Sequence, residues 1–320
     1  MAPRINKATE LLAQSQAIYY VGQHTGHVLT RAQGLKDART WADYVNIGME
    51  HGAFDMAGLA EYMAGLVEGG PTASGHRTPA VIVEPPVRGI DEASVRANAW
   101  QFRQILARGV HGLILCQVET PGAVRAFVEA VRYPHHAQGV DPSLPTPLDR
   151  MRGGTGPAGR VDGGGGAYLL GVGSRGRGSE ATAAPIWGVS QPDYMALADP
   201  WPLNPRGELV LGVKLESPEG VANCDAILAV PGLAYAEMGP GDLGLSFGHT
   251  TMQRDPYPPE LQEARARVFA ACRANAIAYL EGCTPQNIAA RLDEGVRVIA
   301  GQNPETAAVG RAHQKRTMAV

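Results

Sequence analysis

Eight short apolar segments, separated mostly by segments with helical periodicity, constrain the fold of this chain most strongly. The expected strands span residues 17–21, 44–48, 79–83, 112–116, 209–215, 234–238, 276–280 and 296–300. Each is rich in branched apolar or aromatic residues, which is typical of buried parallel strands. Amphipathic helices are expected between them, for example over residues 92–108 and 121–131. Eight strands alternating with helices predict a (β/α)8 TIM barrel.

An open, doubly wound sheet is the alternative arrangement for such a pattern. That fold would lead us to expect a Gly-rich phosphate loop after the first strand, but Gly22-Gln-His-Thr-Gly26 lacks the GxGxxG spacing. The length of 320 residues is long for one ordinary domain and usual for a barrel. We therefore expect residues 1–320 to form one TIM-barrel domain. A short amphipathic helix is expected near Ala8, ahead of the first strand.

The alternation is interrupted between Tyr133 and Asn204, where no clear strand can be predicted. We assign residues 135–205 to a long Gly/Pro-rich insert after the fourth β/α unit. Residues 151–178 contain twelve glycines, so this part buries little surface per ordered residue and is expected to be flexible or to wrap another surface. In the later part of the insert, Arg175 either reaches an anionic substrate or is a solvated loop charge.

Charge and apolar patterning exclude several classes of partner. The net charge of −3 indicates neither nucleic-acid binding nor attachment to an anionic membrane surface. No apolar run approaches the roughly 20 residues that a membrane span requires. The four cysteines form no CxxC pair, which is consistent with a reduced compartment. We expect a cytoplasmic protein that acts on a small-molecule substrate.

Ionisable and polar side chains follow the expected strands, at the barrel end where active sites lie. Glu216 and Asp242 are 26 positions apart, which suits the ends of two consecutive parallel strands joined by one helix. Two carboxylates in that position suit a hard divalent cation such as Mg²⁺ or Mn²⁺. Alternatively, each carboxylate caps the helix that follows it.

Six motifs carry a resemblance to a known family, and the last two are the most specific: Met49-Glu50-His51, Val118-Glu119-Thr120, Arg132-Tyr133-Pro134, Gly171-Val172-Gly173, Lys214-Leu215-Glu216-Ser217 and Gly239-Pro240-Gly241-Asp242-Leu243. With them, residues 17–301 resemble the HpcH/HpaI aldolase/citrate lyase family. The resemblance implies a (β/α)8 barrel with an extra N-terminal helix. It also implies Mg²⁺, Mn²⁺ or Co²⁺ bound by Glu216 and Asp242, and a homo-oligomer, commonly a hexamer built as a trimer of dimers.

The activity that this resemblance implies is that of a metal-dependent carbon–carbon lyase. Its substrate would be a hydroxy 2-oxo acid or a related chelating acid, cleaved through a metal-stabilised enolate. His51 would take part in proton transfer, although a structural histidine at the barrel mouth is the alternative. Contacts to the substrate would come from the strand-end residues Glu50, Gln117, Gly239, Pro240 and Gly241.

Three positions depart from the aldolase pattern of that family. Gly48 stands where an Asp usually orients the histidine, Glu84 where an Arg usually steadies the substrate, and Lys214 where a Gln is usual. Our hypothesis is that Lys214 pairs with Glu84 or takes over stabilisation of the substrate anion, so both are candidate catalytic residues. A structural ion pair and a Schiff-base lysine are the alternatives.

These departures keep other functions open. A family member with altered chemistry would be a decarboxylase, a hydratase, or a lyase for an aromatic or CoA-linked substrate. A barrel that has lost catalysis and only binds a ligand is a third possibility, which the retention of Glu216, Asp242 and His51 argues against.

Overall fold

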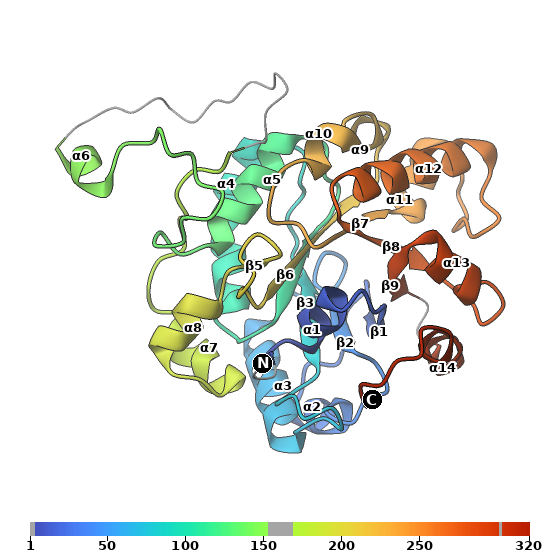
Figure 1. Cartoon of the computed structure of the whole chain (residues 1–320), viewed down its shortest axis with the longest axis horizontal. Helices are drawn as coiled ribbons and strands as arrows, with labels where there is room; N and C mark the ends of the chain where they lie inside the picture. The colour runs from blue at the N-terminus through green and yellow to red at the C-terminus, as the bar shows by residue number, and fades with distance from the viewer. Residues whose placement is uncertain (1–3, 153–168, 301–302) are drawn as a thin grey trace.

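The strands form a closed parallel barrel, in a computed structural model that describes residues 4–152, 169–300 and 303–320. The order is β4-β3-β2-β1-β9-β8-β7-β6, and β6 pairs with β4 to close the ring (Figure 1). The barrel strands are β1 (Ile18–Gln23), β2 (Tyr44–Gly48), β3 (Ala80–Glu84), β4 (Gly112–Leu115), β6 (Leu209–Leu215), β7 (Tyr235–Met238), β8 (Ala278–Gly282) and β9 (Val296–Ala300). The predicted barrel is confirmed, and closure through β4 and β6 excludes the open sheet.

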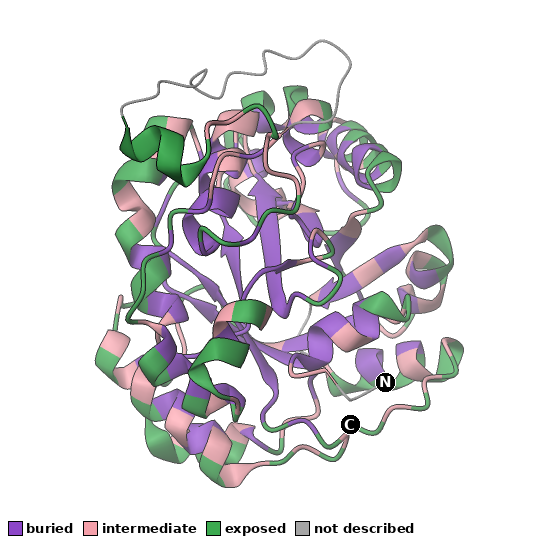
Figure 2. Cartoon of the chain, turned by 60° about the vertical axis from the view of Figure 1, so that its left-hand side comes forward, coloured by how far each residue is buried: buried purple, intermediate pink, exposed green. Residues whose placement is uncertain are grey.

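Helices cover the outside of the ring, and several of them begin at a capping side chain. Asp55, Asp91 and Thr120 each accept a hydrogen bond from a backbone N–H in the first turn of the helix that follows. The outer helices are α2 (Arg31–Asp37), α3 (Met56–Gly69), α4 (Glu92–Leu106), α5 (Pro121–Val131), α9 (Pro218–Ala222), α10 (Cys224–Leu228), α11 (Pro240–Ser246), α12 (Pro259–Ala274), α13 (Ile288–Glu294) and α14 (Pro304–His313). Figure 2 shows the buried strands enclosed by helices whose outer faces are exposed. Among the described helices, none is both long and apolar enough to cross a membrane.

Apolar side chains fill the barrel interior, because alternate residues of each strand point inward. Ile18, Tyr44, Ile82 and Val210 belong to this cluster, as do Ala8 and Leu11 of the N-terminal helix α1 (Lys7–Ala13). Helix α1 is the extra N-terminal helix that the resemblance implied, and it closes the end of the barrel at which the strands begin. The other end is left open for polar side chains.

Asp43, just before β2, joins segments that are far apart in the sequence. Its buried carboxylate lies 3.2 Å from Lys7 Nζ, 2.8 Å from Arg316 and 3.4 Å from Arg311. It also accepts a hydrogen bond from the backbone N–H of Tyr19 at 3.1 Å. One buried acid thus holds the N-terminal helix, β1 and the segment after α14 together.

The insert contains helices and a short strand on both sides of residues 153–168. Residues 153–168 make up much of the predicted Gly-rich stretch and lie outside the described residues. These elements are α6 (Pro147–Met151), α7 (Glu180–Trp187), α8 (Gln191–Leu197) and the two-residue strand β5 (Pro200–Trp201). Trp187 donates a hydrogen bond to the carbonyl of Gly109 at 2.9 Å, next to the start of β4. The second half of the insert therefore packs against the strand-start end of the barrel. We did not predict β5, because two residues are too few to show a strand pattern.

Candidate active site at the strand ends

Gln117 links the two predicted metal ligands, Glu216 and Asp242. Its backbone N–H donates to Glu216 Oε2 at 3.0 Å, and its side-chain amide donates to Asp242 Oδ2 at 3.0 Å. The backbone of Gln117 has a φ of +52°, a left-handed conformation that is uncommon for residues other than glycine. Such strain is characteristic of functional sites. Gln117 therefore bridges the two carboxylates from a backbone conformation that is uncommon for its residue type.

Neither carboxylate caps a helix. Ser217, the residue after Glu216, accepts the capping hydrogen bond from Gly220 at the start of α9. Helix α11 begins at Pro240, so Asp242 lies inside its first turn and Gly239 occupies the cap position. The capping alternative considered for Glu216 and Asp242 is therefore not supported.

A third carboxylate, Glu50, lies beside Glu216. Ligand atoms of Glu50, Cys116 and Glu216 all lie within 4.8 Å of one another. Burial raises the pKa of the Cys116 thiol well above its usual range, so this sulfur is a neighbour of the carboxylates and a poor ligand for a hard cation. Glu50 and Glu216 supply the oxygen atoms that such a cation prefers.

The surroundings of Glu216 fit a divalent cation. A Cβ on Gly239 would stand 2.4 Å from the Glu216 carboxylate, so a glycine there gives this side chain its space. Burial, with the nearby charges of Glu237 and Glu50, raises the pKa of Glu216 to about 8. Burial and the neighbouring carboxylates destabilise the ionised form of Glu216, and a bound cation would stabilise that form. Within the described residues, the group of ligand atoms within 4.8 Å of one another includes Glu50 and Glu216 but not Asp242, which is linked to Glu216 through Gln117. The chemistry of these carboxylates suits Mg²⁺, Mn²⁺ or Co²⁺.

A second cluster at the same mouth centres on Glu84, at the end of β3. Lys214 Nζ lies 3.1 Å from Glu84 Oε1, which confirms the predicted pairing of these two residues. His24 Nδ1, just after β1, lies 2.8 and 2.9 Å from the two oxygens of Glu84. Asn46 also donates to Glu84 Oε1, at 3.0 Å. Glu84 is therefore a buried carboxylate with three protein partners.

Charges within this cluster stabilise one another. Burial alone would raise the pKa of Glu84, but the hydrogen bond with His24 and the charge of Lys214 outweigh it and lower the pKa to about 2. Burial would likewise lower the pKa of Lys214, yet nearby carboxylates such as Glu84 and Glu237 hold it well above its usual range. A lysine that stays protonated supports an ion pair and argues against a Schiff-base role.

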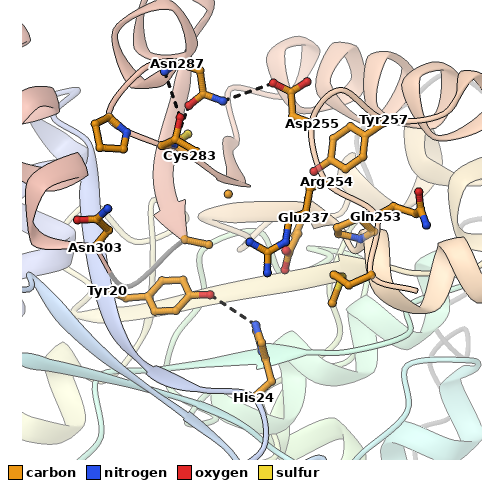
Figure 3. Close-up of a pocket in the computed structure, with 16 residues that line it drawn as sticks. Tyr20, His24, Glu237, Gln253, Arg254, Asp255, Tyr257, Cys283, Asn287 and Asn303 are labelled. Atoms are coloured by element: carbon orange, nitrogen blue, oxygen red, sulfur yellow. Dashed lines mark hydrogen bonds between the residues drawn. The ribbon is translucent and has the colours of Figure 1, made fainter. Parts of the chain in front are cut away.

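A cavity of about 580 Å³ opens at the mouth of the barrel and is bordered by His24 of the Glu84 cluster and by Pro240, two positions before Asp242. Tyr20 and His24 of the β1 end, Glu237 of β7 and Pro240 of α11 form one wall. The lining also includes Arg254, Asp255 and the segment after β8. Figure 3 shows His24 directed toward Tyr20 at the edge of this cavity, with Arg254 extending into it next to Glu237.

The remaining predicted site residues at the strand ends are His51, Glu50, Pro240 and Gly241, and they do not form one cluster. His51 is 54% exposed, and its nearest carboxylate is Glu50, at 3.8 Å. Pro240 borders the cavity, and a Cβ on Gly241 would contact Met252 at 3.3 Å. Glu50 is thus near Glu216, one of the predicted metal ligands, with His51 beside it, and neither residue is bonded to the Glu84 cluster.

Arg175 requires a correction. Its guanidinium is fully buried, donates to Tyr194 Oη at 2.7 Å and to Ser179 Oγ at 2.9 Å, and lies 4.6 Å from the centre of the Tyr133 ring. Tyr194 Oη in turn donates to the carbonyl of Leu106, where α4 ends before β4 begins. Arg175 therefore lies at the strand-start end and packs the insert there, so the prediction that it reaches a substrate was wrong.

Sequence reasoning missed His24 and Arg88. His24 directly follows the first strand, but the pattern of β1 does not show that its ring reaches Glu84. Arg88 Nε donates to Gln117 Oε1, so an arginine does stand at the mouth although Glu84 occupies the position where the family usually has one. The signal for Arg88 was present four residues after Glu84, but no spacing argument places a loop residue there.

Comparisons with known proteins identify the family of this chain. A family model for HpcH/HpaI aldolase/citrate lyase matches residues 76–300. A hydroxypyruvate/pyruvate aldolase of Delftia acidovorans is 30% identical over 57% of this chain and 50% of its own length. A 2-keto-3-deoxy-L-rhamnonate aldolase of Klebsiella pneumoniae is 28% identical over 48% of this chain and 42% of its own. The chain thus spans about half the length of the curated relatives it matches.

Solved structures of low sequence identity share the fold over the whole chain. A family protein from Burkholderia cenocepacia superposes with a TM-score of 0.65 at 20% identity, covering 97% of both chains. An HpcH/HpaI aldolase from Desulfitobacterium hafniense gives a TM-score of 0.59 at 16% identity, covering 96% of this chain and 95% of its own. Because the family model matches more than two thirds of the sequence, the chain belongs to the HpcH/HpaI aldolase/citrate lyase family.

Proposed function

We propose that this protein is a divalent-metal-dependent carbon–carbon lyase that cleaves a hydroxy 2-oxo acid or a related chelating acid. The observation that carries the proposal is the link through Gln117 between Glu216 and Asp242, beside Glu50 at the open end of the barrel. Support also comes from the relatives named hydroxypyruvate/pyruvate aldolase. Family membership by itself supports the coarser description of an aldolase or lyase.

In this proposal Glu216 and Asp242 hold Mg²⁺, Mn²⁺ or Co²⁺. When bound, the cation acts as a Lewis acid that favours the enolate form of the 2-oxo acid fragment. Gln117 orients both carboxylates, and Arg88, bonded to Gln117 Oε1, supplies a positive charge next to them. Lys214 and Arg88 provide the charge that favours an anionic substrate at the mouth. The cavity beside His24 and Pro240 accommodates the rest of the substrate.

The test combines metal titration with product detection. Purified protein stripped with EDTA is loaded with Mg²⁺, Mn²⁺ or Co²⁺ and incubated with a panel of 4-hydroxy-2-oxo acids. Release of a 2-oxo acid that requires the metal supports the proposal. Metal binding without turnover of any panel member would instead favour the ligand-binding barrel. Release of carbon dioxide from oxaloacetate without aldol cleavage would favour an altered-chemistry member such as a decarboxylase.

We also propose that the protein is a cytoplasmic homo-oligomer, a hexamer or trimer of dimers. The support is the family resemblance alone, and sedimentation velocity measures the assembly directly. A single monomeric species at micromolar concentration would contradict it.

A further inference from the structure

The proposed cleavage requires a base for the hydroxyl proton of the leaving fragment, and two histidines stand at the mouth. A general base needs a ring nitrogen free to accept a proton and a fixed orientation. His51 lacks an orienting partner, since Glu50 lies 3.8 Å away and position 48, where the family usually has an Asp, is Gly48. His24 has both requirements.

Glu84 fixes the tautomer of His24. Nδ1 lies within 2.9 Å of both Glu84 oxygens, which accept hydrogen bonds and donate none, so Nδ1 carries a proton. Lys214 Nζ lies 3.1 Å from the same nitrogen and 3.1 Å from Glu84 Oε1. Because an ammonium group only donates, Lys214 bonds the carboxylate and leaves the Nδ1–H in place. Nε2 is then the free acceptor of a neutral ring.

Nε2 faces the cavity. His24 is 45% exposed on its side chain, borders the 580 Å³ space, and has Tyr20 Oη at 3.5 Å from Nε2 (Figure 3). Burial raises the pKa of Tyr20, so its hydroxyl stays protonated and its weak contact suits an accepting Nε2. A substrate hydroxyl that binds Nε2 would replace this contact with Tyr20.

We propose that His24, oriented by Glu84 and Lys214, is the general base of the cleavage and takes the part that the family pattern assigns to His51. The inference rests on the proposed lyase function and deepens it. Geometry carries it, and the hydrogen bond to Glu84 adds support because it raises the pKa of His24 and makes the ring a stronger base.

The proton and electron steps balance without a further reactant. Nε2 takes the proton of the C4 hydroxyl, and the O–H electron pair becomes the second bond of the departing aldehyde. The C3–C4 bond breaks, and its electron pair forms the C2–C3 double bond of the enolate. The protonated Nε2 returns its proton to C3, which gives the 2-oxo acid and restores neutral His24.

The experiment uses a second reaction that yields the same enolate without a base. Decarboxylation of oxaloacetate breaks a carbon–carbon bond with no hydroxyl proton to remove, so it does not need His24. We compare wild type, His24→Gln, His51→Gln and Glu84→Gln for cleavage of 4-hydroxy-2-oxopentanoate and 4-hydroxy-2-oxoglutarate, decarboxylation of oxaloacetate, and Mn²⁺ binding by electron paramagnetic resonance. His313→Gln is the matched control, because it removes another carboxylate-paired histidine, on α14.

His24→Gln is expected to lose cleavage by about a hundredfold or more while keeping decarboxylation and Mn²⁺ binding. Glu84→Gln should reduce cleavage less, again with decarboxylation retained, because Glu84 only positions the ring. If His24→Gln cleaves the aldols at the wild-type rate and His51→Gln loses cleavage, the inference is overturned and the lyase function stays intact. Wild-type protein that decarboxylates and binds Mn²⁺ but cleaves neither aldol contradicts the proposed lyase function, and the inference falls with it.

Discussion

A side chain at position 48 would collide with the backbone of His24. A Cβ on Gly48 would stand 2.0 Å from the His24 carbonyl oxygen and 2.5 Å from its Cα. The absence of a side chain at the end of β2 is therefore what lets the segment after β1 approach closely enough for His24 to reach Glu84. The three departures from the family pattern, at positions 48, 84 and 214, thus converge on one histidine.

Gly48→Ala should therefore displace His24 and lower stability. We expect the free energy of unfolding to fall by about 1–3 kcal/mol, because the nearest atoms belong to backbone and cannot rotate away. Aldol cleavage should fall as well. Urea denaturation and the aldol assay measure both effects. Gly176→Ala is the control, since its Cβ would meet nothing within 4 Å, and a comparable loss there would remove the steric explanation.

Removing either metal ligand should abolish metal-dependent turnover. Glu216→Gln and Asp242→Asn keep the shape of the side chains and take away the charge that a hard cation requires. We expect Mn²⁺ affinity to fall by at least about tenfold in calorimetric titration. Glu219→Gln, an exposed residue three positions later, should bind as wild type does. Unchanged affinity in both ligand variants would exclude Glu216 and Asp242 as ligands.

Lys214→Met should destabilise the protein and reduce turnover. Lys214 is 5% and Glu84 1% exposed, and breaking a buried ion pair from one side costs about 3–5 kcal/mol. The double variant Lys214→Met/Glu84→Gln should recover part of that loss, because no charge is left without its partner. Denaturant unfolding of the two single variants and the double variant gives the coupling energy. Strictly additive effects would contradict the pairing, and unchanged turnover in Lys214→Met would contradict a role in catalysis.

Arg175→Met should change stability and leave substrate kinetics alone. The side chain packs between Tyr133 and Tyr194 at the strand-start end, so its loss weakens the docking of the insert. We expect a lower melting temperature, with KM and kcat within about twofold of wild type. A raised KM without a change in melting temperature would restore the substrate-binding role that the sequence suggested.

His111 should make the protein sensitive to acid. Burial lowers the pKa of His111 to about 3, and its Nδ1 accepts a hydrogen bond from Val81 N at 3.1 Å. The unfolded chain takes up a proton below about pH 6.5, whereas the folded ring does not. This contribution to stability is therefore complete above pH 6.5 and is lost as the pH falls toward 3.

The size of that loss is about 1.4 kcal/mol for each pH unit below 6.5. His111→Asn keeps an acceptor for Val81 and removes the titrating group. The difference in unfolding free energy between wild type and His111→Asn, measured between pH 7 and pH 4, should change with this slope. A difference that is independent of pH would show that His111 is protonated in the folded state.

The barrel was predictable because each of its strands is a separate apolar segment, and because parallel strands must be joined by helices that cover them. The Lys214–Glu84 pair was predictable for a similar reason, since charged side chains at the ends of β3 and β6, which both flank β4, share one mouth. The contact between His24 and Glu84 was not predictable, because it depends on the absence of a side chain at Gly48. The sequence of β1 does not show that the neighbouring strand leaves this space. Arg175 was misplaced because loop length does not say which end of a barrel an insert covers.

The carboxylate of Asp43 has a consequence for the order in which this barrel folds. Its partners Arg311 and Arg316 are more than 260 positions away in the chain, and only Lys7 lies before it. Long-range pairing of this kind is slow, since the entropy of closing the loop is lost before any contact is gained. During synthesis, Asp43 has only one of its three cationic partners until α14, which contains Arg311, and the segment after it, which contains Arg316, emerge. Ring closure between β9 and β1 is therefore expected to be a late event, reached by the whole chain rather than by its first half.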